Sequence, residues 1–345
     1  MKRALVLFAA IAFMLGGAAA FSQDKGTAAA ALPKGKWVIA LSNSYYGNTW
    51  RKQMVEAFNT AAQEAKKQGL IKDYIVVNGD GTQNTQIAQM NSLILKGVDV
   101  ICINAASPTA LNGVIEQAAK KGIKVIAFDS IADSPFCYKM DFDFVMDGVM
   151  RVDYVAKRLN GEGNVIQILG VSGSAPAIQM HQGQNDELKK FPGLKVVAKV
   201  EGEASASVAQ QNTANVLPSL PKVDAVLTQA GNDSYGVVQA FEASGKPMPL
   251  ILGDGTSEFL QWWLQQKKAN NYETISVGSA PGIGGAAFWV GLAILNKVNV
   301  PMSMQLPLSV VTQDDVEKYS NLKPGMVVSP DFTYQYVLDN VINKK

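Results

Sequence analysis

The chain has 345 residues, of which 48% are apolar and 17% charged, the composition of a globular protein rather than of a disordered or fibrous one. Its 31 basic and 29 acidic residues are dispersed, with no basic stripe, which argues against a nucleic-acid partner. The length exceeds the roughly 250–300 residues at which one hydrophobic core stops growing, so we expect two domains.

Residues 1–22 have the layout of a secretory signal peptide. Lys2 and Arg3 precede an apolar run from Ala4 to Leu15, and the small residues 18–20 offer a cleavage site. The alternative is an uncleaved membrane anchor, because residues 4–21 are just long enough to span a bilayer. Cleavage is favoured because half of that run is Ala and Gly. No Cys follows the run, which argues against a lipid anchor. We therefore predict export to the periplasm, with residues 23–35 as a flexible leader.

Apolar runs of strand length alternate with amphipathic runs of helix length in the first half of the chain. The apolar runs show no polar alternation, which is typical of strands buried on both faces of a parallel sheet. The predicted strands are 37–41, 74–77, 98–103 and 125–128. The predicted helices are 49–68, 85–96 and 108–121, the last of which opens on a Ser-Pro cap.

The same alternation resumes after residue 140. The predicted strands are 164–169, 195–200, 224–227, 249–252 and 274–277, and the predicted helices cover about 144–160, 176–190, 205–219, 232–244, 256–268 and 284–297. Regular strand–helix alternation predicts βαβ units and parallel sheets. We therefore expect an α/β fold with two doubly wound parallel-sheet lobes. Such sheets bind ligands beyond the carboxyl ends of their strands, so we expect a cleft between the lobes.

Polar and aromatic side chains follow the predicted strands. Tyr45, Asn48 and Trp50 come after the first strand, and Asp129 and Asp254 come after two later ones. Carboxylates accept hydroxyl protons, amides donate and accept, and aromatic rings cover the C–H faces of a sugar. This combination predicts a site for a neutral polyhydroxylated ligand. Each Asp could instead cap a helix, and Trp50 could belong to the core.

A tryptophan pair and the histidine are two further candidates, the first for lining the cleft and the second for catalysis. Trp262 and Trp263 point about 100° apart on a helix, so we expect one in the core and the other facing the cleft. His181 is the only histidine, and a lone histidine is more often a packed or surface residue than an acid–base catalyst. No nucleophile motif accompanies it. We therefore expect no catalytic residue.

No metal or cofactor is expected either. Asp141, Asp143 and Asp147 are assigned to capping the helix that follows them rather than to a cation site. Cys102 and Cys137 are too far apart to suggest a zinc site. An exported protein could join them in a disulfide, but Cys102 lies in an apolar run, and two buried free thiols are the favoured prediction.

Five segments, in order, resemble those of one family. They are Ser42–Trp50, Ile103–Leu111, Gly122–Asp129, Gln229–Gly236 and Gly253–Thr256. On these residues the chain resembles the periplasmic sugar-binding proteins of ABC transporters, of the ribose- and galactose-binding type, over about residues 36–312. Each segment alone is weakly specific, but five in the right order and spacing are specific.

The resemblance implies two lobes that close on a sugar around a hinge of three crossing segments, near residues 140–142, 278–281 and 306–310. The N-terminal lobe would comprise 36–141 plus 281–308, and the C-terminal lobe 142–280 plus 309–345. The tail 314–345 is unlike the short end of the ribose type, and we expect it to dock on the second lobe. The implied partner is an ABC permease of the inner membrane, with a chemoreceptor as a further partner.

The resemblance also implies roles for individual residues. Asp129 and Asp254 would bind sugar hydroxyls, Trp50 would line the ring, and Asn232 and Asp233 lie in the segment that supplies an amide ligand.

Three positions depart from the ribose type, and they argue against ribose itself. Ser130 stands where that type has an arginine next to the first aspartate. A second arginine, expected on a helix of the second lobe, has only Gln179 and His181 as local candidates. At the last crossing, Ser279 replaces a glutamine.

The predicted function is therefore capture of a monosaccharide or related polyol, without a catalytic step. A sensory receptor of the same fold, for a sugar or an autoinducer-type furanose, remains the main alternative. An exported hydrolase would have to rely on His181, and a repressor would need a helix-turn-helix headpiece where the chain has its apolar leader.

Overall fold

The computed structural model describes residues 35–343. The predicted signal peptide, 1–22, and the predicted leader up to residue 34 lie outside this range. Within it, no helix is both long and apolar enough to cross a bilayer.

The first lobe is built on a six-stranded sheet in the order β11-β5-β4-β3-β1-β2, and its neighbouring strands pair in parallel. The strands are β1 (Val38–Asn43), β2 (Asp73–Asn78), β3 (Val100–Asn104), β4 (Lys124–Phe128), β5 (Tyr138–Phe142) and β11 (Ser303–Leu306). β11 comes from the far end of the chain, so this lobe is discontinuous in sequence.

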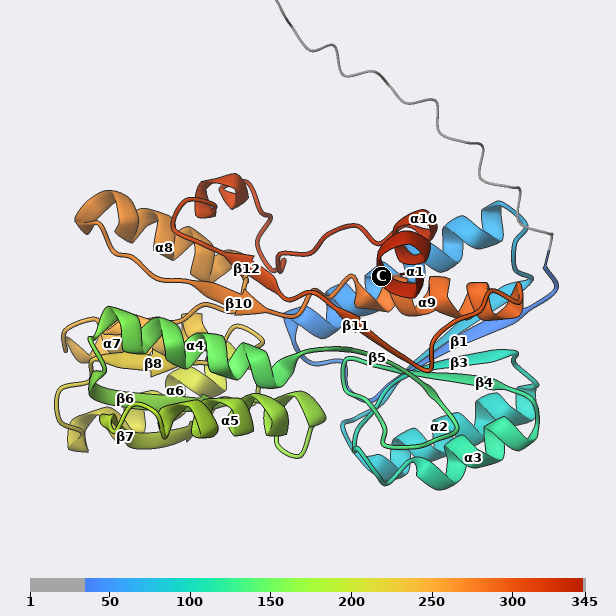
Figure 1. Ribbon diagram of the computed structural model, residues 1–345, viewed down its shortest axis with the longest axis horizontal. Helices are drawn as coiled ribbons and strands as arrows, with labels where there is room; N and C mark the ends of the chain where they lie inside the picture. The colour runs from blue at the N-terminus through green and yellow to red at the C-terminus, as the bar shows by residue number, and fades with distance from the viewer. Residues whose placement is uncertain (1–34, 344–345) are drawn as a thin grey trace, which may run out of the picture. The chain divides into compact units, whose positions relative to one another are not determined.

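Helices cover both faces of this sheet (Figure 1). On one face lie α2 (Gln83–Lys96) and α3 (Asn112–Lys120), packed against Ile101 and Ile103 of β3. On the other face lie α1 (Thr49–Lys67) and α9 (Ile283–Leu295). Cys102, between the two isoleucines, points to this second face, where its Sγ lies 3.5 Å from the Ala287 carbonyl oxygen of α9. Both faces of the central strands are thus buried, as the unbroken apolar runs predict.

The second lobe has a four-stranded parallel sheet in the order β7-β6-β8-β9. Its strands are β6 (Glu162–Leu169), β7 (Gly193–Glu201), β8 (Ala225–Leu227) and β9 (Leu250–Ile251). A bridge from Gly253 to Ser276 extends it to β10 (Ser276–Gly278), which pairs antiparallel with β12 (Ser309–Val311). Its helices are α4 (Phe144–Arg158), α5 (Ala175–Leu188), α6 (Ala206–Val216), α7 (Asp233–Ser244) and α8 (Ser257–Asn270).

The strands of the second lobe also bury both faces. Val165, Ala225 and Leu227 pack with α4, whereas Ile166 and Val226, one residue along, pack with α6, α7 and α8. The chain passes between the two sheets after β5, after β10 and after β11. The predicted α/β class with two parallel-sheet lobes is confirmed, while the residue boundaries of the lobes remain a proposal.

Two predicted elements differ from the observed ones. Residues 107–111 form turns rather than the first turn of a helix, because the Ser107 hydroxyl accepts hydrogen bonds from the backbone N–H groups of Thr109 and Ala110. As a result α3 begins at Asn112. β5 was expected only as a crossing segment, although its sequence YKMDF alternates polar and apolar residues as a half-buried strand does, and it pairs with both β4 and β11.

The C-terminal segment contacts both lobes, whereas the sequence led us to expect docking on the second lobe alone. A short helix at Val316–Tyr319 packs beside α8 of the second lobe. Further on, α10 (Tyr334–Val337) packs on α9 of the first lobe, with the Tyr334 ring centroid 5.6 Å from that of Trp289. Figure 1 shows this segment, in red, lying over α9.

Cys102 and Cys137 are both buried and free, as expected. Burial raises the pKa of each thiol above its ordinary value.

Candidate functional site

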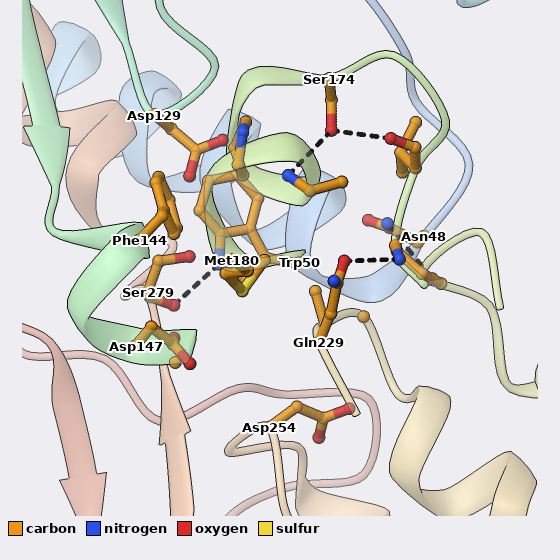
Figure 2. Close-up of a pocket in the computed structure, with 18 of the residues that line it drawn as sticks. Asn48, Trp50, Asp129, Phe144, Asp147, Ser174, Met180, Gln229, Asp254 and Ser279 are labelled. Atoms are coloured by element: carbon orange, nitrogen blue, oxygen red, sulfur yellow. Dashed lines mark hydrogen bonds between the residues drawn. The ribbon is translucent and has the colours of Figure 1, made fainter. Parts of the chain in front are cut away.

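One pocket is lined by residues that follow strands of both lobes (Figure 2). Its empty space amounts to about 620 Å³, a figure that includes open solvent. Five of the ten residues predicted from the sequence line it, namely Asn48, Trp50, Asp129, Asp254 and Ser279.

Asp129 lies directly after β4 in a strained backbone conformation. Its φ of 57° falls in the left-handed region, which Asp tolerates better than most residues. Non-glycine residues in this region cluster at functional sites, where the surrounding structure holds them. The Asn104 side-chain amide donates to Asp129 Oδ2 at 2.9 Å. Burial raises the pKa of Asp129, and the nearby charge of Arg51 and the Asn104 hydrogen bond oppose that shift.

Arg51 is a site residue that the sequence analysis missed. It lies in the first turn of α1, lines the pocket and is buried. Its guanidinium donates to Asn104 Oδ1, to Asn43 Oδ1 at 3.0 Å and to Ser44 Oγ at 3.3 Å. The residue next to Asp129 in the sequence is the uncharged Ser130. The cation near Asp129 is Arg51, which lies 78 positions earlier on α1.

Trp50 and Asn48 connect the start of α1 with other parts of the fold. The Trp50 indole Nε1 donates to the Ser279 carbonyl at 2.8 Å, at the crossing that follows β10. Asn48 caps α1, since its side chain accepts from the Arg51 backbone N–H at 2.8 Å. The same side chain donates to the Ala204 carbonyl of the second lobe at 3.3 Å. These residues therefore bring both lobes to one pocket.

Asp254 combines the two roles that the sequence analysis weighed against each other. It lines the pocket, and its Oδ2 also accepts from the backbone N–H groups of Asn232, at 2.9 Å, and Ser234, at 3.5 Å. Its Oδ1 accepts from the backbone N–H and hydroxyl of Thr256. The carboxylate is thus held at the N-terminus of α7, where backbone N–H groups favour negative charge.

The remaining predicted residues lie outside the pocket lining. Ser130 is buried, and its hydroxyl donates to the Ala105 carbonyl at 2.8 Å. Asp233 is buried and accepts from the Ser205 backbone N–H at 3.0 Å, and burial raises its pKa well above the usual value. Asn232 accepts from the Thr256 hydroxyl at 2.8 Å.

Tyr45 and His181 are the other two predicted residues that lie outside the pocket lining. Tyr45 lines a neighbouring cavity that shares Arg51 and Ser174 with the pocket. His181 is partly buried on α5, and burial lowers its pKa.

The tryptophan pair of α8 does not face the pocket, so that prediction was wrong. Trp262 and Trp263 are both buried in the core of the second lobe. The indole of Trp263 donates to Gln313 Oε1 at 3.0 Å, and that of Trp262 donates to Glu242 Oε1 at 3.1 Å. Both rings are buried because the C-terminal segment that supplies Gln313 covers one side of α8 while the sheet covers the other.

The three aspartates assigned to helix capping have different surroundings. Asp143 caps α4, accepting from the Met146 backbone N–H at 2.9 Å. Asp147 instead pairs with Arg151 inside the second lobe. Asp141 lies in β5, where burial and the neighbouring Asp129 raise its pKa to about 8. Across residues 35–343 no three metal-binding side chains gather.

Comparison with known proteins places this fold and site in a family. The model of the periplasmic binding protein domain family matches residues 39–298, and the chain belongs to this family. A solute-binding protein of an ABC transporter from Thermobispora bispora has a similar structure, with a TM-score of 0.84 and 36% identity, covering 89% of this chain and 95% of that one.

Two relatives carry names that state a ligand. A xylitol-binding protein of Mycolicibacterium smegmatis is 26% identical over 68% of this chain and 67% of its own length. A ribose import binding protein of Bacillus subtilis is 25% identical over 81% of this chain and 88% of its own length. The predicted family resemblance is confirmed.

Proposed function

We propose that the mature chain, after removal of residues 1–22, is a periplasmic substrate-binding protein that captures a monosaccharide or related polyol and delivers it to an ABC permease. The observation that carries the proposal is the pocket, which is lined from both lobes by carboxylate, amide and indole groups. Contacts from both lobes allow a ligand to favour one arrangement of the two over others.

The electrostatics of the pocket support a neutral ligand. Arg51 compensates Asp129, Arg151 compensates Asp147, and Asp254 is held by backbone N–H groups. The relatives named above are named for a sugar and a sugar alcohol, so the proposal is a ligand class rather than one compound.

We assign the contacts with ligand hydroxyls to Asp129, Asn48, Ser279 and Asp254, and the stacking contact with the ligand ring to Trp50. Asn232 and Ser130 support the two strand ends that carry Asp254 and Asp129. Asp233 instead accepts from the backbone N–H groups of Ser205 and Ala230. Tyr45 borders the adjoining cavity, and His181 has no assigned role.

The test is ligand binding by residues 23–345, unfolded and refolded to remove any bound compound, against pentoses, hexoses, deoxysugars and polyols. Intrinsic tryptophan fluorescence and thermal melting report binding. A one-to-one ligand at a hundredfold excess over its Kd should stabilise the fold by about 2.7 kcal/mol.

Two variants show whether the response arises in this pocket. Trp50→Ala should weaken binding at least about tenfold, because the ring covers a large apolar face. Trp37→Phe, at the amino end of β1 and therefore at the opposite edge of the sheet, should leave the affinity unchanged. Silence across the whole panel, or equal loss in both variants, would contradict the proposal.

A further inference from the structure

A buried ion pair fixes one wall of the pocket. Asp147 and Arg151 lie four residues apart on α4, with side chains 1% and 0% exposed. Arg151 Nε donates to Asp147 Oδ1. Its other N–H groups donate to the Thr228 hydroxyl and to the carbonyl oxygens of Gly253, Gln229 and Val277. Since a guanidinium has five donors, Arg151 has none left for a ligand. It therefore acts by positioning Asp147 and the ends of β8, β9 and β10.

Asp147 keeps an unused acceptor. Its Oδ2 is buried without a hydrogen-bond partner, although the residue lines the pocket. Buried carboxylate oxygens are nearly always hydrogen-bonded, so this atom requires a donor from elsewhere.

Gln229 keeps an unused donor in the same pocket. Its Oε1 accepts from the Gly170 backbone N–H at 2.7 Å, and that contact fixes which way the amide faces. Its Nε2 is buried without a partner, and the residue lines the pocket and is 2% exposed. Figure 2 shows Asp147 and Gln229 among the side chains around the pocket.

The rest of this wall is apolar. α5 supplies Ala177 and Met180 to the lining, and Phe144 of α4 adds an aromatic ring. A ligand edge that carried hydroxyls all along this wall would leave most of them without partners, which costs binding free energy.

We propose that Asp147 and Gln229 recognise two polar groups of the ligand, a hydroxyl that donates to Asp147 Oδ2 and an oxygen that accepts from Gln229 Nε2. The neighbouring edge of that ligand is apolar, as in a deoxygenated or alkylated sugar or polyol, and it lies against Phe144, Ala177 and Met180. This inference rests on the proposed function, and it adds specificity residues on α4 and after β8.

The experiment measures affinity for the best ligand of the panel and for its single-deoxy and O-methyl analogues. Asp147→Asn should weaken binding of the parent ligand about 10- to 150-fold, the range for a hydrogen bond to a charged group. Asp143→Asn is the matched control on the same helix. Asn caps helices as well as Asp does, so this control should change affinity less than about twofold.

The analogues identify the ligand atom involved. One deoxy analogue should bind the wild type more weakly than the parent ligand does. Asp147→Asn should bind that analogue and the parent ligand about equally well. Gln229→Met leaves the ion pair intact and tests the second contact if Asp147→Asn fails to fold. Gln229→Met should lower the affinity for the parent ligand and leave unchanged the affinity for one analogue that lacks the accepting oxygen.

The outcomes separate the two proposals. If the wild type binds a panel member and neither Asp147→Asn nor Gln229→Met shifts its affinity more than about twofold, the inference is wrong and the proposed function stands. If Asp147→Asn does not fold, the inference is tested by Gln229→Met alone. It is overturned if Gln229→Met shows no selective loss of affinity. If the wild type binds nothing in the panel, both proposals fail together.

Discussion

Buried charges around the pocket are compensated in different ways at individual residues. Asp129 has Arg51 nearby, and Asp147 has Arg151 in direct contact. Asp141, on the crossing strand β5, faces Asp129, and the charge of Asp129 raises its pKa further instead of opposing the effect of burial. Its side chain accepts a hydrogen bond from the Phe142 backbone N–H, at 2.7 Å to Oδ1. Asp141 is therefore a carboxyl group that favours its protonated form in the fold.

We predict that Asp141→Asn stabilises the protein at alkaline pH. The pKa of Asp141 is about 8 in the folded chain and near 3.8 when unfolded, so the folded state binds more protons between these values. Its contribution to the free energy of unfolding is therefore present at low pH and is lost as pH rises from about 4 to 8.

The amide of the Asn variant mimics the protonated carboxyl and should add at least about 1.4 kcal/mol at pH 8.5, the equivalent of one pKa unit. Denaturant unfolding at pH 5 and pH 8.5 measures this gain, with Asp143→Asn as the control. An equal gain at both pH values would contradict the assignment.

At the scale of elements, the pocket wall depends on the close approach of two helices. A Cβ at Gly148 of α4 would collide with the Met180 carbonyl of α5, and a Cβ at Gly183 of α5 would collide with the Val145 carbonyl of α4. Two glycines thus let the helix backbones touch. This contact sets the positions of Asp147 on α4 and Met180 on α5, which both line the pocket.

We predict that Gly183→Ala destabilises the fold by about 1–3 kcal/mol, because the backbones must separate. The matched control is Gly113→Ala in α3. A Cβ there meets no atom within 4 Å, so this change should be neutral or stabilise the fold by up to about 1 kcal/mol. Thermal melting of both variants compares the two sites. A stabilised Gly183→Ala variant would show that the helices do not pack this tightly.

How far the sequence predicts these elements depends on the kind of signal each carries. β1, β3 and β4 are largely apolar runs without polar alternation, and their length and composition identify them within a few residues. β5 carries the alternation of a half-buried strand over only five residues, and the sequence analysis did not assign it as one. β10 and β12 are three residues each, too short for any periodicity.

The site was predicted best where its residues directly follow strands, as Asp129 and Asp254 do. Arg51 and Arg151 belong to helices, and their part in the site arises from tertiary contacts between distant segments. The available signal was an arginine on the apolar face of an amphipathic helix, since Arg151 lies next to Val152 and one turn before Val155. A charged residue in that position is rarely buried without a specific partner.

At the scale of the whole described chain, the C-terminal segment joins the lobes beside the three crossings. Gln53 of α1 holds the Val327 backbone at both ends, since its Nε2 donates to the carbonyl at 3.0 Å and its Oε1 accepts from the N–H at 2.7 Å. Val327 also bridges to Thr256 of the second lobe, and the Ser329 hydroxyl accepts from the Gly282 N–H. This segment must therefore hold or exchange its contacts whenever the lobes shift.

We predict that Gln53→Ala releases this segment locally. Both backbone groups of Val327 lose a partner, so amide hydrogen exchange at residues 325–329 should speed up, and the free energy of unfolding should fall by about 1–3 kcal/mol. Gln63→Ala is the control on the same helix, because its side chain makes only an exposed 3.4 Å contact with Tyr74. If both variants exchange like the wild type, the Gln53 contact does not hold the segment.

The two buried thiols have a practical consequence. The reactive form of cysteine is the thiolate, and burial keeps Cys102 and Cys137 protonated and out of reach of reagents. Because the chain has only these two cysteines, one introduced at Ile178, 53% exposed and next to the pocket-lining Ala177, would be the single site for a maleimide dye. A dye placed there would make the protein an optical sensor for its own ligand, with no need to remove a native cysteine first.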